Sequence, residues 1–187
     1  DNSDLNSSCR CWFSLLYFGH DEKKIHILNG GLKKWIFENK PTTKDKTEII
    51  ESNYVANEKE NLVVSFDQIK KNILSKSFNV IDARSLERFE GKVSEPRKGL
   101  RSGHIQNSFC LPFNQCINQK TGEFKNLEEL RELFNQNENI EKRLDQVFTC
   151  GSGVTAAVLA YAYKMVNNDY IPKIYDGSWS EYGKYPA

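Results

Sequence analysis

The sequence predicts an α/β protein with one parallel sheet, helices on both faces of that sheet, and a partial second copy of the unit in front. Three observations support this prediction. Short β-rich runs alternate with helical patterns over residues 62–187, which is typical of a parallel sheet. One such run ends at Cys150, where a glycine turn and an apolar helix follow. Residues 1–39 match the last third of this unit in order and spacing.

The first part of the chain, residues 1–39, is expected to contain two helices and a strand. Ser7 or Ser8 is placed to cap a helix that ends at Gly19. A buried strand, a glycine turn and a short helix follow, at residues 25–28, 29–31 and 32–38. Residues 40–61 are rich in charge, threonine and asparagine, which predicts a linker. The linker is expected to touch a domain surface at Ile49, Ile50, Tyr54 and Val55.

The rest of the chain, residues 62–187, is expected to fold as the complete unit, with Ser65 as the cap of its first helix. The expected helices lie at residues 66–74, at 127–134 and from 152–154 onward, and a short turn or helix is expected to run through Phe89. The expected strands lie at residues 78–83, 108–111, 146–149 and 173–175. Ligands of open parallel sheets bind beyond the carboxyl ends of the strands, which is where Cys150 lies.

Composition excludes several classes of protein. The chain carries 26 Lys and Arg against 25 Asp and Glu, so no strong field favours nucleic acid as a partner. No apolar run approaches the roughly 20 residues that cross a bilayer, so we expect no membrane partner. The pair Cys9 and Cys11 lacks a second ligand pair, so we expect no metal. Five cysteines are too few for a disulfide scaffold, which favours a reducing compartment, either cytoplasmic or mitochondrial.

The sequence around Cys150 is suited to a nucleophile. Gly151 and Gly153 allow backbone conformations that turn several amide N–H groups toward one point. The first turn of the following helix adds unpaired N–H groups and the positive end of its dipole, which favour a thiolate. The alternative is core packing, the usual role of a lone cysteine. Two glycines weaken the local structure unless something approaches the backbone, so we favour catalysis over packing.

The proposed repeat in the first unit rests on one register. Aligning residues 174–177 with residues 27–30 superposes a strand, a glycine turn and an aromatic helix. The same register places Cys150 on Ser3. The first unit therefore lacks a cysteine at the position of the nucleophile.

Five motifs follow each other along the chain: Asp82-Ala83-Arg84, Glu95-Pro96-Arg97, Gly103-His104-Ile105, Cys150-Gly151-Ser152-Gly153-Val154-Thr155-Ala156 and Tyr175-Asp176-Gly177-Ser178-Trp179. Together they resemble the catalytic half of the two-domain rhodanese family, and within it the 3-mercaptopyruvate sulfurtransferases. The resemblance implies a rhodanese-like catalytic domain at 62–187 and the remnant of an inactive domain at 1–39. It also implies transfer of a sulfane sulfur from 3-mercaptopyruvate to Cys150, giving a persulfide and pyruvate. The sulfur then passes to cyanide or to a thiol, such as thioredoxin or a small thiol, without a cofactor.

The resemblance also assigns roles to residues. Cys150 is the nucleophile, and Ser152 takes part in catalysis and discriminates between donors. Arg88 and Arg97 hold the carboxylate of the donor. The other substrate-binding residues are Gly151, Gly153, Val154 and Thr155. In this family the serine forms a triad with a His and an Asp of the first domain, and this chain contains no counterpart of those two.

Without the resemblance, the sequence does not decide which cationic side chains bind the donor. Arg84, Lys98 and Arg101 are further candidates for binding an anionic donor, although Arg84 is expected to brace the loop against Asp82. His104 is expected to cap or pack at a strand entrance.

Three other functions compete. Thiosulfate sulfurtransferase is the first alternative, although the related enzymes specific for thiosulfate carry basic residues in the loop where this chain has Gly151 and Ser152. A cysteine phosphatase needs an arginine six residues after its cysteine, and Ala156 excludes it. The third alternative is a non-catalytic rhodanese-like binding module, because the first domain is truncated. In that case Trp12, Phe13 and Trp35 are expected to lack core partners.

Overall fold

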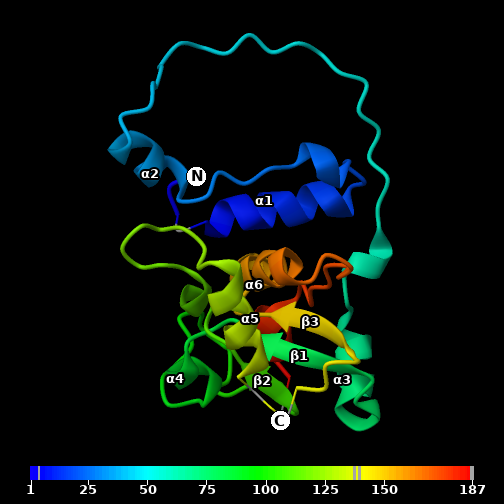
Figure 1. Cartoon of the computed structure of the whole chain (residues 1–187). Helices are drawn as coiled ribbons and strands as arrows, with labels where there is room; N and C mark the ends of the chain where they lie inside the picture. Colours follow the sequence, from blue (N-terminus) through cyan, green and yellow to red (C-terminus); the bar gives the residue numbers. More distant parts are fainter. Residues whose placement is uncertain (4, 137, 139, 186–187) are drawn as a thin grey trace.

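The computed structural model describes residues 1–3, 5–136, 138 and 140–185 of the chain. Within them a parallel sheet of three strands has the order β2-β1-β3 (Figure 1). The strands are β1 (Phe78–Asp82), β2 (Ser108–Cys110) and β3 (Asp145–Thr149). Ile81 of β1 lies opposite Phe109 on one side and Phe148 on the other. The carboxyl ends of all three strands therefore meet at one edge, immediately before Cys150.

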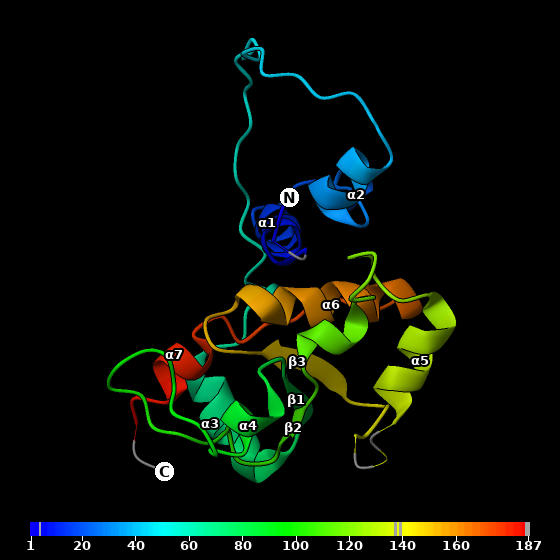
Figure 2. The same ribbon diagram turned by 90° about the vertical axis from the view of Figure 1, so that its left-hand side faces the viewer.

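Helices cover both faces of this sheet, which confirms the predicted fold class (Figure 2). On one face α5 (Leu127–Asn135) and α6 (Val154–Val166) pack with α1 (Asn6–Tyr17) in the larger core. On the other face α3 (Phe66–Ser75) and α7 (Ser178–Tyr182) form a smaller core. The short helix α4 (Leu86–Phe89) follows β1. The strand expected at 173–175 is reduced to single parallel bridges from Ile174 to Phe148 and Val63.

The helix α1 packs on α6, so the expectation that Trp12 and Phe13 lack core partners is wrong. Each of these two residues is 2% exposed. The ring of Trp12 meets that of Tyr161 edge to face, with centroids 5.0 Å apart. The alanines of α6 leave room for these rings, and burial of such a side chain contributes about 1.5–3 kcal/mol. Trp35 is half-buried, and its Nε1 donates to the carbonyl of Pro41 at 2.9 Å.

Two predictions for the first unit are wrong in detail. Ser7 and Ser8 lie inside the first turn of α1, which begins at Asn6. The Asp1 carboxylate accepts the N–H of Ser8 at 2.5 Å, so a more distant acidic residue supplies the cap. Residues 25–28 are extended without a strand partner in the described chain. Ile25 and Ile27 pack on the larger core, whereas Leu28 is 49% exposed, so the expected buried strand does not form. The second helix, α2 (Gly31–Phe37), is confirmed.

Residues 40–59 contain neither helix nor strand, and Figure 1 shows them arching away from the sheet. Ile49, Ile50 and Val55 are 84–91% exposed, so three of the four expected surface contacts are wrong. Only Tyr54 makes its contact, because its hydroxyl donates to the carbonyl of Phe18 at 2.5 Å. Short 3-10 helices complete the chain: η1 (Glu22–Lys24), η2 (Glu60–Leu62) and η3 (Phe113–Cys116). Each helix in the described part is too short or too polar to pass through a bilayer.

Candidate active site

The cysteine loop, residues 150–155, connects β3 to α6 at the carboxyl edge of the sheet, as predicted. Gly153 has φ +77°, a left-handed conformation that glycine adopts without strain, and α6 begins at the next residue. The N–H of Ser152 points at the Cys150 sulfur, with the nitrogen 3.4 Å from Sγ. The N–H groups of Gly151, Gly153 and Val154 donate to no protein acceptor in the described part of the chain.

These features suit the cysteine loop to binding an anionic sulfur. Amide N–H groups that converge at a turn, together with the first turn of a helix, stabilise negative charge without carrying a titratable proton. Cys150 itself is only 2% exposed, so the sulfur lies in a nearly closed site. The sulfur does not lie among apolar side chains alone, because the N–H of Ser152 points at it and the guanidinium groups of Arg88 and Arg97 lie over the neighbouring Gly151.

The residues after Tyr175 hold the backbone of the cysteine loop. Ser178, fully buried, accepts the N–H of Cys150 at Oγ over 3.3 Å and donates to the carbonyl of Tyr175 at 2.9 Å. The carbonyl of Cys150 accepts the N–H of Trp179 at 2.9 Å. In the sequence this closing motif contributed only to the family resemblance. Its position directly after the strand expected at residues 173–175 was a signal that it could reach the loop.

The two arginines expected to bind the donor both lie over the cysteine loop. A Cβ built on Gly151 would lie 3.0 Å from Nη2 of Arg88 and 3.6 Å from Nη1 of Arg97. Any side chain at position 151 would therefore displace Arg88. Arg97 is exposed, and no ion pair joins it to another residue within the described ranges.

Glu95 orients Arg88, a role that sequence reasoning missed. Its Oε2 lies 2.6 Å from Nη2 of Arg88, and its Oε1 accepts from Nη1 of Arg84 at 2.8 Å. Burial alone would raise the pKa of Glu95, but the hydrogen bond from Arg88 and the charges of both arginines outweigh it and lower that pKa. The carboxylate therefore stays ionised and fixes one guanidinium edge of Arg88. The glutamate two residues before Arg97 in the quoted motif was the available signal.

Arg84 braces the loop against Asp82, as expected. Its Nε lies 3.0 Å and its Nη2 lies 2.7 Å from Oδ2 of Asp82, and both side chains are 1% exposed. Nη2 also donates to the carbonyl of Gly103 at 2.8 Å, and the guanidinium lies 4.4 Å from the centre of a Trp179 ring. Arg101 lies 4.7 Å from a ring of the same tryptophan. Arg84 is therefore not available to a donor. Arg101 is half-buried with its Nε donating to the carbonyl of Tyr185, and Lys98 is an exposed loop residue.

The remaining predicted residues line the end of the loop. Ser152 and Thr155 are half-buried, and Val154 is 36% exposed in the first turn of α6. The hydroxyl of Ser152 has no hydrogen-bond partner among the residues that the structure describes. It is therefore available to a bound molecule.

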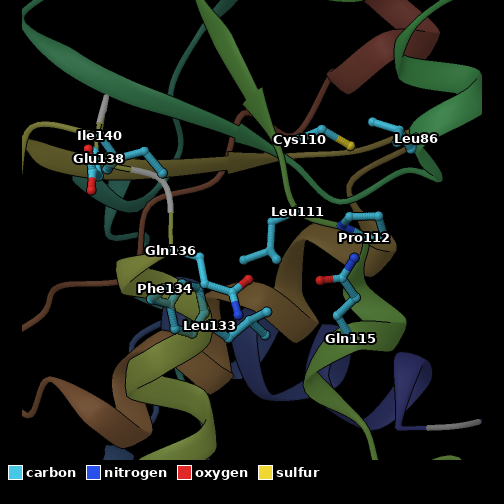
Figure 3. Close-up of a pocket in the computed structure, with 10 residues that line it drawn as sticks. All are labelled: Leu86, Cys110, Leu111, Pro112, Gln115, Leu133, Phe134, Gln136, Glu138 and Ile140. Carbon is cyan, nitrogen blue, oxygen red and sulfur yellow. The ribbon is translucent and has the colours of Figure 1, made fainter.

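Three further cysteines and His104 lie outside the cysteine loop and have the surroundings of packing residues. Burial raises the pKa of the Cys9, Cys110 and Cys116 thiols to about 12, so these thiols stay protonated near neutral pH. Cys110 lines a pocket between α4, η3 and α5 whose lining does not include Cys150 (Figure 3). His104 stacks on Phe89 with ring centres 4.0 Å apart, and its Nδ1 lies 2.8 Å from the Phe89 carbonyl oxygen. No cluster of three acidic, histidine or cysteine side chains suited to a metal occurs in the described ranges.

The chain matches a known protein family and resembles several known proteins. The family model "Rhodanese-like domain" matches residues 65–185. Human 3-mercaptopyruvate sulfurtransferase is 36% identical over 184 residues, which are 97% of this chain and 60% of that protein. Thiosulfate/3-mercaptopyruvate sulfurtransferase 1, mitochondrial, of Arabidopsis thaliana is 34% identical over 207 residues, 100% of this chain and 53% of its own length. The chain thus spans little more than half the length of these relatives.

A solved structure shows the same fold. SseA from Escherichia coli, described as a 3-mercaptopyruvate sulfotransferase, superposes with a TM-score of 0.80 and is 31% identical. The superposition covers 97% of this chain and 65% of SseA.

Proposed function

The chain belongs to the rhodanese family, and from that premise we propose that it transfers a sulfane sulfur from 3-mercaptopyruvate to a thiol or cyanide through a persulfide on Cys150. One observation carries this proposal. The N–H of Ser152 points at the Cys150 sulfur, and the guanidinium groups of Arg88 and Arg97 lie over Gly151 beside it. A nucleophilic sulfur and two carboxylate-binding cations therefore share one small site.

In the first step the Cys150 thiolate attacks the sulfur of 3-mercaptopyruvate. The new S–S bond forms as the donor's C–S bond breaks, and the electron pair of that bond leaves as the enolate of pyruvate, which takes up a proton. Arg97 pairs with the donor's carboxylate, because it has no ion pair of its own in the described chain. Arg88, held along one edge by Glu95, directs its remaining N–H groups at the same anion.

In the second step the thiolate of the acceptor attacks the outer sulfur of the persulfide. The S–S bond to Cys150 breaks, the acceptor leaves as a persulfide, and the Cys150 thiolate is restored. Both the thiolate and the persulfide are anions, and the N–H groups of residues 151–154 stabilise them in place of water. A protein such as thioredoxin or a small thiol fits this chemistry as the acceptor, in a reducing compartment, either cytoplasmic or mitochondrial. No cofactor is needed, because each step exchanges one bond to sulfur for another.

The donor is assigned from the chemistry of the loop. Ser152 adds a neutral hydroxyl without an internal partner, and the cations lie outside the loop, which suits a donor whose charge is a carboxylate some distance from its sulfur. Thiosulfate carries its charge on the group that bears the transferred sulfur. It is the second candidate because a matched relative is named for both donors.

The test measures turnover with each donor. We expect the chain to release pyruvate from 3-mercaptopyruvate faster than it forms thiocyanate from thiosulfate and cyanide. Cys150→Ser should abolish both reactions, whereas Cys11→Ser removes an exposed thiol and should change neither. Faster transfer from thiosulfate would overturn the donor assignment. Absence of any turnover by the folded chain would favour a binding module.

A further inference from the structure

An arginine from the first unit of the chain reaches the cysteine loop. Nη1 of Arg10, on α1, donates to the carbonyl of Gly153 at 3.2 Å and forms an ion pair with Asp176. A Cβ on Gly153 would lie 3.0 Å from this nitrogen and 2.6 Å from Oδ1 of Asp176. The ion pair therefore packs directly against the loop backbone, with no space left between them.

The hydrogen bond from Arg10 constrains one of the loop's donors. The Gly153 carbonyl and the Val154 N–H belong to one peptide unit, which is planar and trans, so the two bonds point in opposite directions. Holding the carbonyl on the α1 side therefore fixes the direction of the Val154 N–H. That N–H has no other partner in the described structure.

The same ion pair is linked to the other end of the loop. Asp176 lies two residues before Ser178, whose Oγ accepts the N–H of Cys150 at 3.3 Å. Arg10 thus connects the segment that holds Cys150 with the segment that begins α6. Its charge is compensated by Asp176, so its effect on the sulfur comes from orientation and not from a net positive charge.

We propose that Arg10 is a positioning residue for sulfur transfer: through the Gly153 carbonyl it fixes the Val154 N–H as a donor to the anionic sulfur, beside the N–H of Ser152. This inference rests on the proposed function. It assigns a part in the reaction to the first unit, which the resemblance describes as the remnant of an inactive domain.

A matched control exists on the same interface. Lys34 pairs with Glu123 at 2.5 Å, and this ion pair also joins residues 1–39 to the later unit. Neither residue of the pair contacts the cysteine loop in the described structure. The side chains of this pair are 32% and 27% exposed, against 33% and 44% for Arg10 and Asp176. Lys34→Ala therefore removes a comparable ion pair, together with a longer one of 3.5 Å to Glu38 on its own side of the interface, without touching the loop.

The experiment compares Arg10→Ala, Arg10→Lys and Lys34→Ala in the full chain. Loss of a direct donor to a reacting anion lowers kcat about 10²–10³-fold, and because Arg10 acts through one peptide unit we expect a decrease of about tenfold. The KM for 3-mercaptopyruvate should stay unchanged, because Arg88 and Arg97 remain. Arg10→Lys should recover most of kcat, and Lys34→Ala should leave it unchanged. An Arg10→Ala variant whose kcat equals that of Lys34→Ala, or whose defect lies in KM, would overturn the inference.

A second readout does not depend on turnover. The rate at which iodoacetamide alkylates Cys150, followed on the peptide that contains it, reports how well the loop stabilises the thiolate. Arg10→Ala should react more slowly than Lys34→Ala at the same pH, and equal rates would contradict the role of Arg10. If the wild-type chain transfers no sulfur, the proposed function fails while this comparison still decides the inference.

Discussion

Replacing Arg84 by methionine is expected to destabilise the fold more than any other single change near the site. The side chains of Arg84, Asp82 and Glu95 are each 1% exposed, so removal of the cation leaves Asp82 buried without an ion-pair partner in the described chain and Glu95 with that of Arg88 alone. Breaking a buried ion pair by deleting one partner costs about 3–5 kcal/mol. This is a large part of the ~5–15 kcal/mol that stabilises a native protein. Methionine keeps an unbranched apolar stem but lacks the guanidinium that lies over Trp179.

Urea unfolding followed by tryptophan fluorescence measures this loss as a lower midpoint at unchanged slope. Arg101→Met is the matched control, because Arg101 lies over the same tryptophan but, among the residues that the structure describes, its side chain hydrogen-bonds only to the exposed carbonyl of Tyr185. The control should cost no more than about 1 kcal/mol. An Arg84→Met variant whose unfolding free energy lies within about 1 kcal/mol of wild type would refute the claim that the buried ion pairs of Arg84 with Asp82 and Glu95 stabilise the fold.

The loss of stability should depend on pH. The pKa of Glu95 is lowered in the folded protein, since the hydrogen bond from Arg88 and the charges of Arg84 and Arg88 outweigh burial. Glu95 therefore contributes stability that is present above its ordinary value of 4.5 and is lost as the pH falls through the folded value. Arg84→Met removes part of this contribution. The difference in unfolding free energy between the two proteins should narrow below pH 4.5, and a difference that widens on acidification would contradict the assignment.

Four further substitutions test the packing and the site. Ser178→Ala leaves the buried N–H of Cys150 without an acceptor and should cost about 1–3 kcal/mol in urea unfolding, whereas a neutral effect would argue against a stabilising role of the hydrogen bond from Cys150 to Ser178. Gly153→Ala places a Cβ against Asp176 in a left-handed conformation that costs roughly 1–2 kcal/mol, and it should reduce sulfur transfer; full activity would contradict the close packing. Trp12→Ala should lower the unfolding free energy by about 3–5 kcal/mol, and a loss below 1 kcal/mol would show that α1 packs loosely on α6. Arg97→Ala should raise the KM for 3-mercaptopyruvate about tenfold or more, as loss of a charge-assisted hydrogen bond implies, and an unchanged KM removes it from the site.

Local signals were sufficient for much of the fold. The Ser65 cap of α3 forms a full capping box with Gln68, as its spacing suggests. The β-rich run before Cys150 and the alanine-rich helix after it are strand and helix as expected. A strand, a glycine turn and a helix follow each other directly here, and this order fixes where the residue between the strand and the turn lies. The position of Cys150 at the sheet edge was therefore predictable.

Features that depend on distant partners were not predictable. The apolar run at residues 25–28 suits a strand, but a strand also needs a neighbour, and no pattern within the run supplies one. Likewise the cap of α1 comes from Asp1, beyond the usual position of a capping residue. Arg10 acts through contacts with Gly153 and Asp176, which are far away in the sequence, and its own surroundings resemble ordinary charged surface. Glu95 contacts Arg84 and Arg88 within the same segment, but an irregular loop has no periodicity that would predict which side chains meet. The domain boundaries and the internal repeat stay predictions.

The central claim is that Cys150 carries the sulfur between donor and acceptor. The most direct measurement is a single turnover with one equivalent of 3-mercaptopyruvate and no acceptor, followed by alkylation and peptide mapping by mass spectrometry. We predict that one extra sulfur atom is found on the peptide that contains Cys150, and that it disappears when a thiol acceptor is added. Sulfur on the peptides of Cys11 or Cys110, or on Cys150→Ser protein, would contradict the account.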